Sequence, residues 1–236
     1  MKKGTLFLIP SPISQDQNMK DILLPMYLDT VCNLEYFIVE TPKIARSFLK
    51  DLPLKKKIQD ISISVLDEHT TQEQLIELVE PLEQGNDVGV MSDAGLPTVA
   101  DPGYRIVYVA QQKGIDVKAF VGPNSIILAL MLSGLNGQSF AFNGYLPKEK
   151  GQKRKRIKSL ERIALNTDQT QIFMETPYKN QYMLEDILDV CEEDSRLCVA
   201  MNIMSNNEYA VTKKISEWKR ENISLEKVPC LFLLNK

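Results

Sequence analysis

The chain has 236 residues, enough for one large or two small domains with a real hydrophobic core. Hydrophobic residues make up 44% of it and charged residues 25%, and a net charge of −3 predicts no global attraction to nucleic acid or to an anionic membrane. No stretch approaches the roughly 18 apolar residues of a membrane span, so we expect a cytoplasmic protein.

Cysteine and histidine usage excludes two classes of site. The chain has four cysteines, none in a Cys-x-x-Cys pair, and a single histidine, His69. A zinc site of ordinary spacing is therefore not expected, and we predict no metal. The cysteines are expected to be buried or half-buried thiols in a reducing compartment. Catalysis by a Ser-His-Asp triad would depend on His69 alone.

Short apolar runs alternate with helical patterns in the first half. A helix is expected over 70–84, with a capping box of Thr70 and Glu73. Another is expected from Asp101, as N-cap before Pro102, to Gly114. A third, mostly apolar and buried, is expected over 124–134. Strands are expected at 5–10, 34–40, 61–66, 87–91 and 116–121. This order predicts an α/β domain with a largely parallel sheet.

The pattern restarts after Gly137 with more closely spaced strands. We expect a basic helix over 148–164, a second helix over 178–191, and strands at 138–146, 170–175, 196–203, 207–213 and 229–234. Such spacing favours a mixed, partly antiparallel α+β sheet. The predicted domains are residues 1–118 and 119–236.

A nine-residue connection, Ser92–Ala100, follows the apolar run at 87–91. Long connections at the carboxyl ends of parallel strands are commonly functional, since ligands bind outside those ends. Asp93 directly follows the run and is a candidate for accepting hydrogen bonds from a ligand. Gly95 permits close backbone approach and Pro97 stiffens the loop. For Asp101 we prefer the role of a helix cap.

The segment 121–125, Val-Gly-Pro-Asn-Ser, joins another strand to another helix. It offers free N–H groups at a helix N-terminus, although capping alone also explains Asn124. Two such loops at one sheet edge are expected to converge on a cleft beside the second domain. Neither loop has a glycine pattern typical of dinucleotide or P-loop sites.

These residues resemble a known family. "SDAGLPTVADPGY" with "GPNSIILALMLSGL" and "FAFNGYLP" is similar to the tetrapyrrole methylase family of S-adenosylmethionine (SAM)-dependent methyltransferases. The most similar branch contains the small-subunit ribosomal RNA ribose 2′-O-methyltransferase. The resemblance runs from "GTLFLIPSPI" through "IFMETPY" to the last strand, which is nearly the whole chain.

The resemblance implies two α/β domains, a SAM cleft between them and a homodimer. Carried over position by position, it implies SAM contacts at Pro10, Asp93, Leu96, Ser125, Ile126, Phe173, Met174, Ala200, Met201, Pro229 and Cys230. Methyl transfer is an in-line displacement that depends mostly on alignment of donor and acceptor. Tyr104, Tyr145, Tyr178 and Glu175 are candidates for orienting the acceptor, but the sequence assigns no catalytic residue.

The chain also departs from the branch. "SPISQD" stands where the branch reads "TPIGNL", and Glu40-Thr41-Pro42-Lys43 stands where it reads "EDTR". "AMNIMS", 200–205, replaces "ARELTK", so an Arg-Glu pair and a lysine are absent, although Glu208 is a candidate to match a nearby acid. These losses leave the acceptor open.

The segment Lys148–Lys158 holds seven basic residues and one acid. It can contact RNA phosphates, but charge runs are more often solvated faces, and no aromatic residue interleaves it. Because the most similar motifs come from the RNA branch of the family, the resemblance leads us to expect a SAM-dependent methyltransferase with an rRNA ribose 2′-hydroxyl as its acceptor. The alternatives are a methyltransferase acting on a tetrapyrrole or other small molecule, and a SAM-binding protein that has lost turnover.

Overall fold

The computed structural model describes residues 2–236 and divides into two compact units, Met1–Asn124 and Ser125–Lys236. The boundary expected from the sequence, between 118 and 119, would cut the last strand of the first unit, Asp116–Ala119. The observed division follows that strand and its loop. Over residues 2–236, none of the helices has the length and apolarity needed to cross a bilayer.

The first unit contains a five-stranded sheet in the order β3-β2-β4-β1-β5. Every pair in it is parallel. Its strands are β1 (Thr5–Leu8), β2 (Tyr36–Val39), β3 (Ser62–Val65), β4 (Val88–Met91) and β5 (Asp116–Ala119). The five apolar runs expected to be strands are thus confirmed, as is the parallel α/β class.

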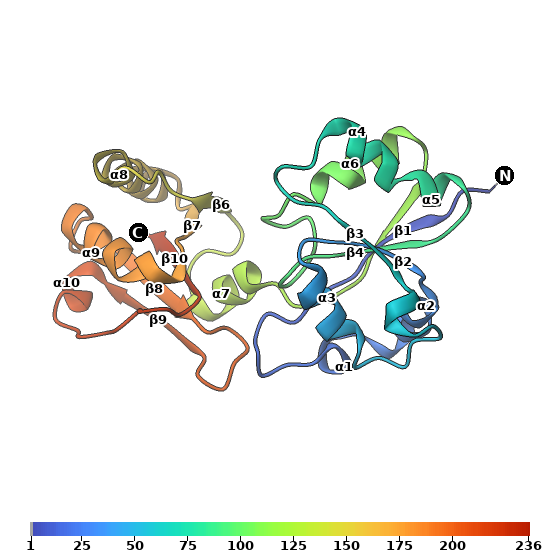
Figure 1. Ribbon diagram of the computed structural model, residues 1–236. Coiled ribbons are helices and arrows are strands. Elements are labelled where there is room, and N and C mark those ends of the chain that lie inside the picture. The colour runs from blue at the N-terminus through green and yellow to red at the C-terminus, as the bar shows by residue number, and fades with distance from the viewer. Residues whose placement is uncertain (1) are drawn as a thin grey trace. The chain divides into compact units, whose positions relative to one another are not determined.

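Helices cover both faces of this sheet (Figure 1). The connections after β1 and β2 run toward β3, whereas those after β3 and β4 run back toward β5. Because parallel crossovers are right-handed, opposite directions of travel place helices on opposite faces. One face carries α1 (Met19–Ile22), α2 (Pro25–Asn33) and α3 (Pro42–Leu49), and the other carries α4 (Gln72–Leu78), α5 (Glu80–Glu83) and α6 (Tyr104–Gln112). A 3-10 turn, η1 (Ile58–Asp60), precedes β3.

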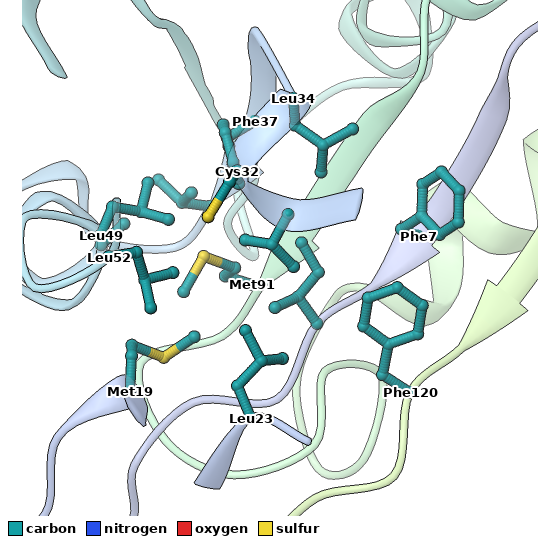
Figure 2. Packing of buried hydrophobic residues seen from close by; sticks show 14 of the residues in the cluster. Phe7, Met19, Leu23, Cys32, Leu34, Phe37, Leu49, Leu52, Met91 and Phe120 are labelled. Carbon is teal, nitrogen blue, oxygen red and sulfur yellow. The ribbon is translucent and has the colours of Figure 1, made fainter. Parts of the chain in front are cut away.

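Each face has its own apolar core. Figure 2 shows the core under α1, α2 and α3, where Met19, Cys32 and Leu49 pack against the strand residues Phe37 and Met91. The opposite core joins Leu75, Val79 and Leu82 with Ile106, Val109 and the strand residues Leu6, Val88 and Val90. Burial of this kind stabilises a fold by about 25 cal/mol per Å² of apolar surface. The sheet is therefore fixed from both sides.

The helix expected over 70–84 differs from the prediction in where it starts and in being interrupted. The capping box uses Thr71 and Gln74 rather than Thr70 and Glu73. The expected single helix over 70–84 is also two helices, α4 and α5, because Pro81 has no N–H to donate to the preceding turn.

Asp101 is not the N-cap of α6, which begins at Tyr104 after Gly103. Its carboxylate instead accepts the N–H groups of Thr98 and Gly103, so it shapes the turn that leads into the helix. At the far end the prediction is confirmed: Gly114 has a φ of +62° and donates to the Gln111 carbonyl, which closes the helix.

The second unit contains a mixed five-stranded sheet in the order β6-β7-β10-β8-β9. The pair β6–β7 is parallel and the other pairs are antiparallel. Its strands are β6 (Phe140–Tyr145), β7 (Thr170–Met174), β8 (Arg196–Met201), β9 (Tyr209–Lys214) and β10 (Cys230–Asn235). The expected mixed second sheet is confirmed.

The helices of this unit are α7 (Ser125–Ser133), α8 (Lys150–Thr167), α9 (Asn180–Val190) and α10 (Ile215–Trp218), with a 3-10 turn η2 (Pro177–Lys179). Residues of α8, α9 and α10 share one core with β7, β8 and β10 (Figure 1). The expectation that the apolar helix over 124–134 is buried holds for one face only. Ile126, Ala129 and Leu130 are buried, whereas Ile127 and Met131 are exposed.

All four cysteines are buried and carry free thiols, and their burial agrees with the expectation from the sequence. Cys32 lies in the first unit, and Cys191, Cys198 and Cys230 lie in the second. Burial raises the pKa of each of these thiols above its ordinary value. At neutral pH they are therefore protonated apolar side chains rather than nucleophiles.

Gly122 provides a test of this packing. A Cβ on residue 122 would lie 2.1 Å from the Pro10 Cβ atom. Gly122→Ala therefore forces apart the loop that follows β1 and the loop that follows β5. We expect it to lower the free energy of unfolding of the first unit by about 1–3 kcal/mol, as overpacking does. Gly137→Ala is the matched control, because a Cβ there meets nothing within 4 Å. Equal urea midpoints for the two variants would contradict the packing described.

Candidate functional site

The strand order defines a switch point at the carboxyl ends of β1 and β4. These strands are neighbours, but the chain leaves β1 toward β2 and leaves β4 toward β5, in opposite directions along the sheet. In open α/β sheets, ligands bind outside the carboxyl ends of strands at such a point. The two loops found there are the segment after Leu8 and the long connection Ser92–Ala100 that the sequence singled out.

Backbone hydrogen bonds tie these two loops together. The Ser11 N–H donates to the Gly95 carbonyl at 2.8 Å, and the Gly95 N–H donates to the Ser11 carbonyl at 3.1 Å. The Ser11 hydroxyl, fully buried, donates to the Ser92 carbonyl at 2.7 Å. Beyond the parallel β1–β4 pair, the two loops thus meet in one isolated antiparallel bridge. Residues 92–95 are therefore fixed by the loop after β1.

A third loop reaches the same place. The position of a Cβ on Gly122 would lie 2.1 Å from the Pro10 Cβ and 3.4 Å from the Leu96 Cδ2. The structure therefore brings together Pro10, Leu96 and Gly122, from the loops after β1, β4 and β5. The predicted convergence of the 92–100 and 121–125 loops is seen within the first unit. Only glycine allows this approach at position 122.

Asp93 is half-buried and bonded to the start of α3. Its two carboxylate oxygens accept the Thr41 N–H at 3.0 Å and the Thr41 hydroxyl at 2.7 Å. Its own N–H donates to the Glu40 carboxylate at 2.7 Å. The side chain therefore anchors the N-terminus of α3 to the long loop. A direct contact between Asp93 and a ligand stays a prediction.

Two further carboxyl groups lie behind the loop. Glu40 and Asp101 line a small cavity together with Ser92 and Pro97. Burial raises the pKa of Glu40; the Asp93 N–H opposes this, and the charges of Asp101 and Asp93 add to it. Burial also raises the pKa of Asp101, against the N–H groups of Gly103 and Thr98. Both side chains thus favour the neutral form more than a solvent-exposed acid does.

In the second unit, residues carried over from the family lie at one end of the sheet. Met201 pairs with Cys230, and Met174 pairs with Leu231, which in turn pairs with Ala200. The Asn202 N–H donates to the Pro229 carbonyl at 3.1 Å. The structure therefore brings the carried-over ends of β7, β8 and β10 side by side.

Not every carried-over side chain in this unit is accessible. Phe173 is fully buried in the core and Ala200 is 1% exposed, so their side chains are closed to a ligand in this structure. Ser125 is the first residue of α7 and half-buried, and Ile126 is buried. Met174 and Met201 are half-buried.

The segment that replaces the branch's charged residues is a tight loop. Asn202 and Met204 have φ values of +52° and +62°, in the left-handed region. The Met204 N–H donates to the Glu208 carboxylate at 2.7 Å. Glu208, the candidate match to a family acid, thus closes this loop onto its own backbone.

Much of the basic segment is engaged in ion pairs within the unit. Lys153 is buried, with its Nζ 3.7 Å from both Glu175 and Asp186. Arg154 contacts Asp186 and Asp189, and Lys158 pairs with the buried Glu161 at 2.7 Å. The Arg156 guanidinium donates to the Asn143 side chain at 2.9 Å. The expected solvated charge run is therefore partly structural, and Glu175 is one of its partners.

Sequence reasoning missed the residues that organise the first unit's loops. Ser11 and Thr41 hold the loop through hydrogen bonds, and Glu40 accepts the Asp93 N–H. Their place at or just after the end of an expected strand, like that of Asp93, is the signal in the sequence that points to them. Among residues 2–236, no group of three or more His, Cys, Asp or Glu side chains is arranged to hold a metal ion.

The fold of this chain is that of a known methyltransferase. The crystal structure of the methyltransferase CobJ superposes on all of the chain and on 95% of its own, with a TM-score of 0.64 and 14% sequence identity. The profile described as Tetrapyrrole (Corrin/Porphyrin) Methylases matches residues 30–218. The chain therefore belongs to this family, as the sequence motifs indicated, and it is a methyltransferase.

Curated relatives are similar over most of the chain. A protein of Vibrio cholerae is 28% identical over 98% of this chain and 76% of its own length. One of Haemophilus influenzae is 31% identical over 93% of this chain and 74% of its own. One of Thermotoga maritima is 28% identical over 91% of this chain and 90% of its own. Each is named Ribosomal RNA small subunit methyltransferase I.

The raised pKa of Glu40 predicts a pH effect. The folded state favours the protonated form of Glu40. The stability that this group contributes is therefore fully present below the ordinary glutamate pKa and is lost as pH rises through the folded-state pKa. Glu40→Gln retains an oxygen that accepts the Asp93 N–H but carries no charge. We expect the variant to gain stability relative to wild type as pH rises from about 4 to about 8, measured by urea unfolding.

Glu73→Gln is the control for this series. Hydrogen bonds from its own N–H and from the Thr71 hydroxyl lower the pKa of exposed Glu73, so its variant should lose stability relative to wild type as pH rises. A Glu40→Gln difference that is constant over the whole pH range would contradict the interpretation.

Proposed function

We propose that this methyltransferase uses SAM to methylate a ribose 2′-hydroxyl of small-subunit ribosomal RNA. The similarity to the Vibrio cholerae relative over 98% of this chain carries the proposal. A cytoplasmic location goes with this acceptor. The switch-point loops of the first unit support a bound small molecule, because two of them are joined by backbone hydrogen bonds and the third packs closely against both.

We propose that the SAM contacts are those expected from the family resemblance. In the first unit they are Pro10, Asp93 and Leu96. In the second they are Ser125, Ile126, Phe173, Met174, Ala200, Met201, Pro229 and Cys230. The chemistry of this set fits an adenosyl group and a sulfonium: apart from Asp93, which is bonded to Thr41, its side chains are uncharged. Recognition would rest on apolar surface and backbone groups.

SAM supplies an activated methyl group when bound. The residues of this chain align donor and acceptor and exclude water, which is the main requirement of an in-line displacement. Leu96, Met174 and Met201 are half-buried apolar side chains suited to that exclusion. Asp93, through Thr41, keeps the long loop against α3. No side chain is assigned as the group that accepts the hydroxyl proton.

For RNA contact we propose a smaller set than the whole segment Lys148–Lys158. Lys148, Lys150 and Lys155 are exposed, and within residues 2–236 they form no ion pair. Their charges are therefore available to phosphates, whereas those of Lys153, Arg154 and Lys158 are largely balanced.

Methyl transfer tests the proposed function. The expected result is that SAM and S-adenosylhomocysteine (SAH) bind in calorimetry, and that label from methyl-labelled SAM enters unmethylated small ribosomal subunits. Alkali-resistant dinucleotides then identify the ribose 2′-position. Label in a tetrapyrrole fraction only would favour the small-molecule alternative, and SAH binding without label in any fraction would favour lost turnover.

Titration of the RNA at several salt concentrations tests the RNA contact. Lys150→Ala/Lys155→Ala should weaken RNA binding and flatten its salt dependence, with SAH affinity unchanged. Lys56→Ala/Lys57→Ala removes equal charge from the first unit and should leave RNA binding intact. Equal losses in the two variants would argue against α8 as the contact.

We also propose a homodimer. Exposed apolar side chains support it: Ile127, Met131 and Leu132 on α7, and Tyr104 and Tyr108 on α6. Each pair spaced by four residues lies on one helix face, and apolar clusters of this kind commonly mark protein interfaces.

Met131 tests the dimer. Its side chain is 72% exposed, so Met131→Glu should fold normally while the charge opposes burial at an interface. We expect sedimentation equilibrium to show a dimer for wild type and a shift toward monomer for the variant. Met26→Glu is the matched control, since Met26 is 74% exposed on α2. A monomeric wild type would exclude the homodimer.

A further inference from the structure

The long loop contains backbone that most residues avoid. Gly95, Thr98 and Ala100 have φ values of +74°, +74° and +63°. Glycine adopts this left-handed region freely, but for a β-branched residue such as Thr98 it is a genuine outlier. Strain of this kind persists only where surrounding contacts enforce it, and it concentrates at functional sites. Some contact must therefore hold residues 98–100.

The Asp101 carboxylate makes that contact. The Thr98 N–H donates to both of its oxygens, at 3.0 Å to Oδ1 and 2.8 Å to Oδ2. The Gly103 N–H donates to Oδ1 at 2.6 Å. The chain leaves room for the carboxylate, because a Cβ on Gly103 would lie 2.7 Å from Asp101 Oδ1. The Asp101 side chain thus accepts backbone N–H groups at both ends of the strained segment, from Thr98 and from Gly103.

The segment between two anchors includes a proposed SAM contact. Gly95 is held by Ser11 through the paired backbone hydrogen bonds, and Thr98 is held by Asp101. Leu96 lies between them, with its Cδ2 against Gly122. The Ser11 backbone that holds Gly95 is not in the left-handed region. The bonds between the Asp101 carboxylate and the Thr98 N–H, in contrast, have to offset the left-handed backbone of Thr98 and Ala100.

We propose that Asp101 is a positioning residue for methyl transfer, which holds Leu96 and the strained backbone of residues 96–100 in the conformation that binds SAM. This rests on the proposed function, since it assigns Leu96 to the SAM site. Asp101 itself does not touch SAM. Its contribution is to make the binding conformation of the loop the populated one, so that SAM need not order the loop on binding.

The first experiment compares SAH affinity and steady-state kinetics of wild type, Asp101→Ala and Asp101→Asn. The alanine variant should bind SAH roughly tenfold more weakly, the effect expected for releasing strain of this size. The KM for SAM should rise more than kcat falls. The asparagine variant retains Oδ1, which accepts from both Thr98 and Gly103, but places an amide NH2 where Oδ2 accepted the Thr98 N–H. Its SAH affinity should therefore fall between those of wild type and the alanine variant. Asp116→Ala, at an exposed residue of β5, is the control for lost charge.

The decisive test is a double-mutant cycle in which glycine at positions 98 and 100 removes the backbone strain. Glycine adopts positive φ without penalty, so in a Thr98→Gly/Ala100→Gly background Asp101→Ala should cost less than about threefold in SAH affinity. Thermal unfolding of each variant without ligand separates loop effects from loss of the fold.

An equal cost of Asp101→Ala in both backgrounds, or wild-type affinity for Asp101→Ala, would overturn the positioning role alone. Failure of wild type to bind SAH would instead overturn the proposed function, and the positioning role with it. The two failures are thus distinguishable.

Discussion

The pair of backbone hydrogen bonds between Ser11 and Gly95 organises the first unit's functional edge. Right-handed crossovers send the chain away from β1 and β4 in opposite directions, and this leaves their carboxyl ends without a covering helix. Loops at such a point would ordinarily be mobile. The Ser11–Gly95 pair extends the strand contact into them, and Gly122 admits the third loop against Pro10. Asp93 then joins the same loop to α3 through Thr41.

The two units differ in the surroundings of their charged side chains, and composition does not show this difference. In the first unit, three acids gather near the long loop, and burial raises the pKa of Glu40 and Asp101. In the second, acids of α9 and the end of β7 neutralise cations of α8. The seven basic residues of one segment therefore do not form seven phosphate sites. Position relative to buried partners decides which charges are available to a polyanion.

The sequence predicted the strands, the fold class and the family well, because apolar runs and loop motifs are local signals. It also pointed to the long loop by its length. Contacts that depend on distant segments were out of reach: Asp93 and Thr41 are 52 residues apart, and Ser11 and Ser92 are 81 apart. The shift of the capping box to Thr71 reflects competition between two adjacent threonines, which spacing alone does not resolve. For α7, a uniformly apolar pattern gave no sign of which face packs.

The distribution of cysteines makes each unit a reporter of its own opening. One buried thiol belongs to the first unit and three belong to the second. Because the thiolate reacts and burial keeps these groups protonated, alkylation in the native state has to wait for local or global unfolding. The rate at which Cys32 is modified, set beside the rates for Cys191, Cys198 and Cys230, thus measures whether the two halves of this methyltransferase unfold together or one at a time.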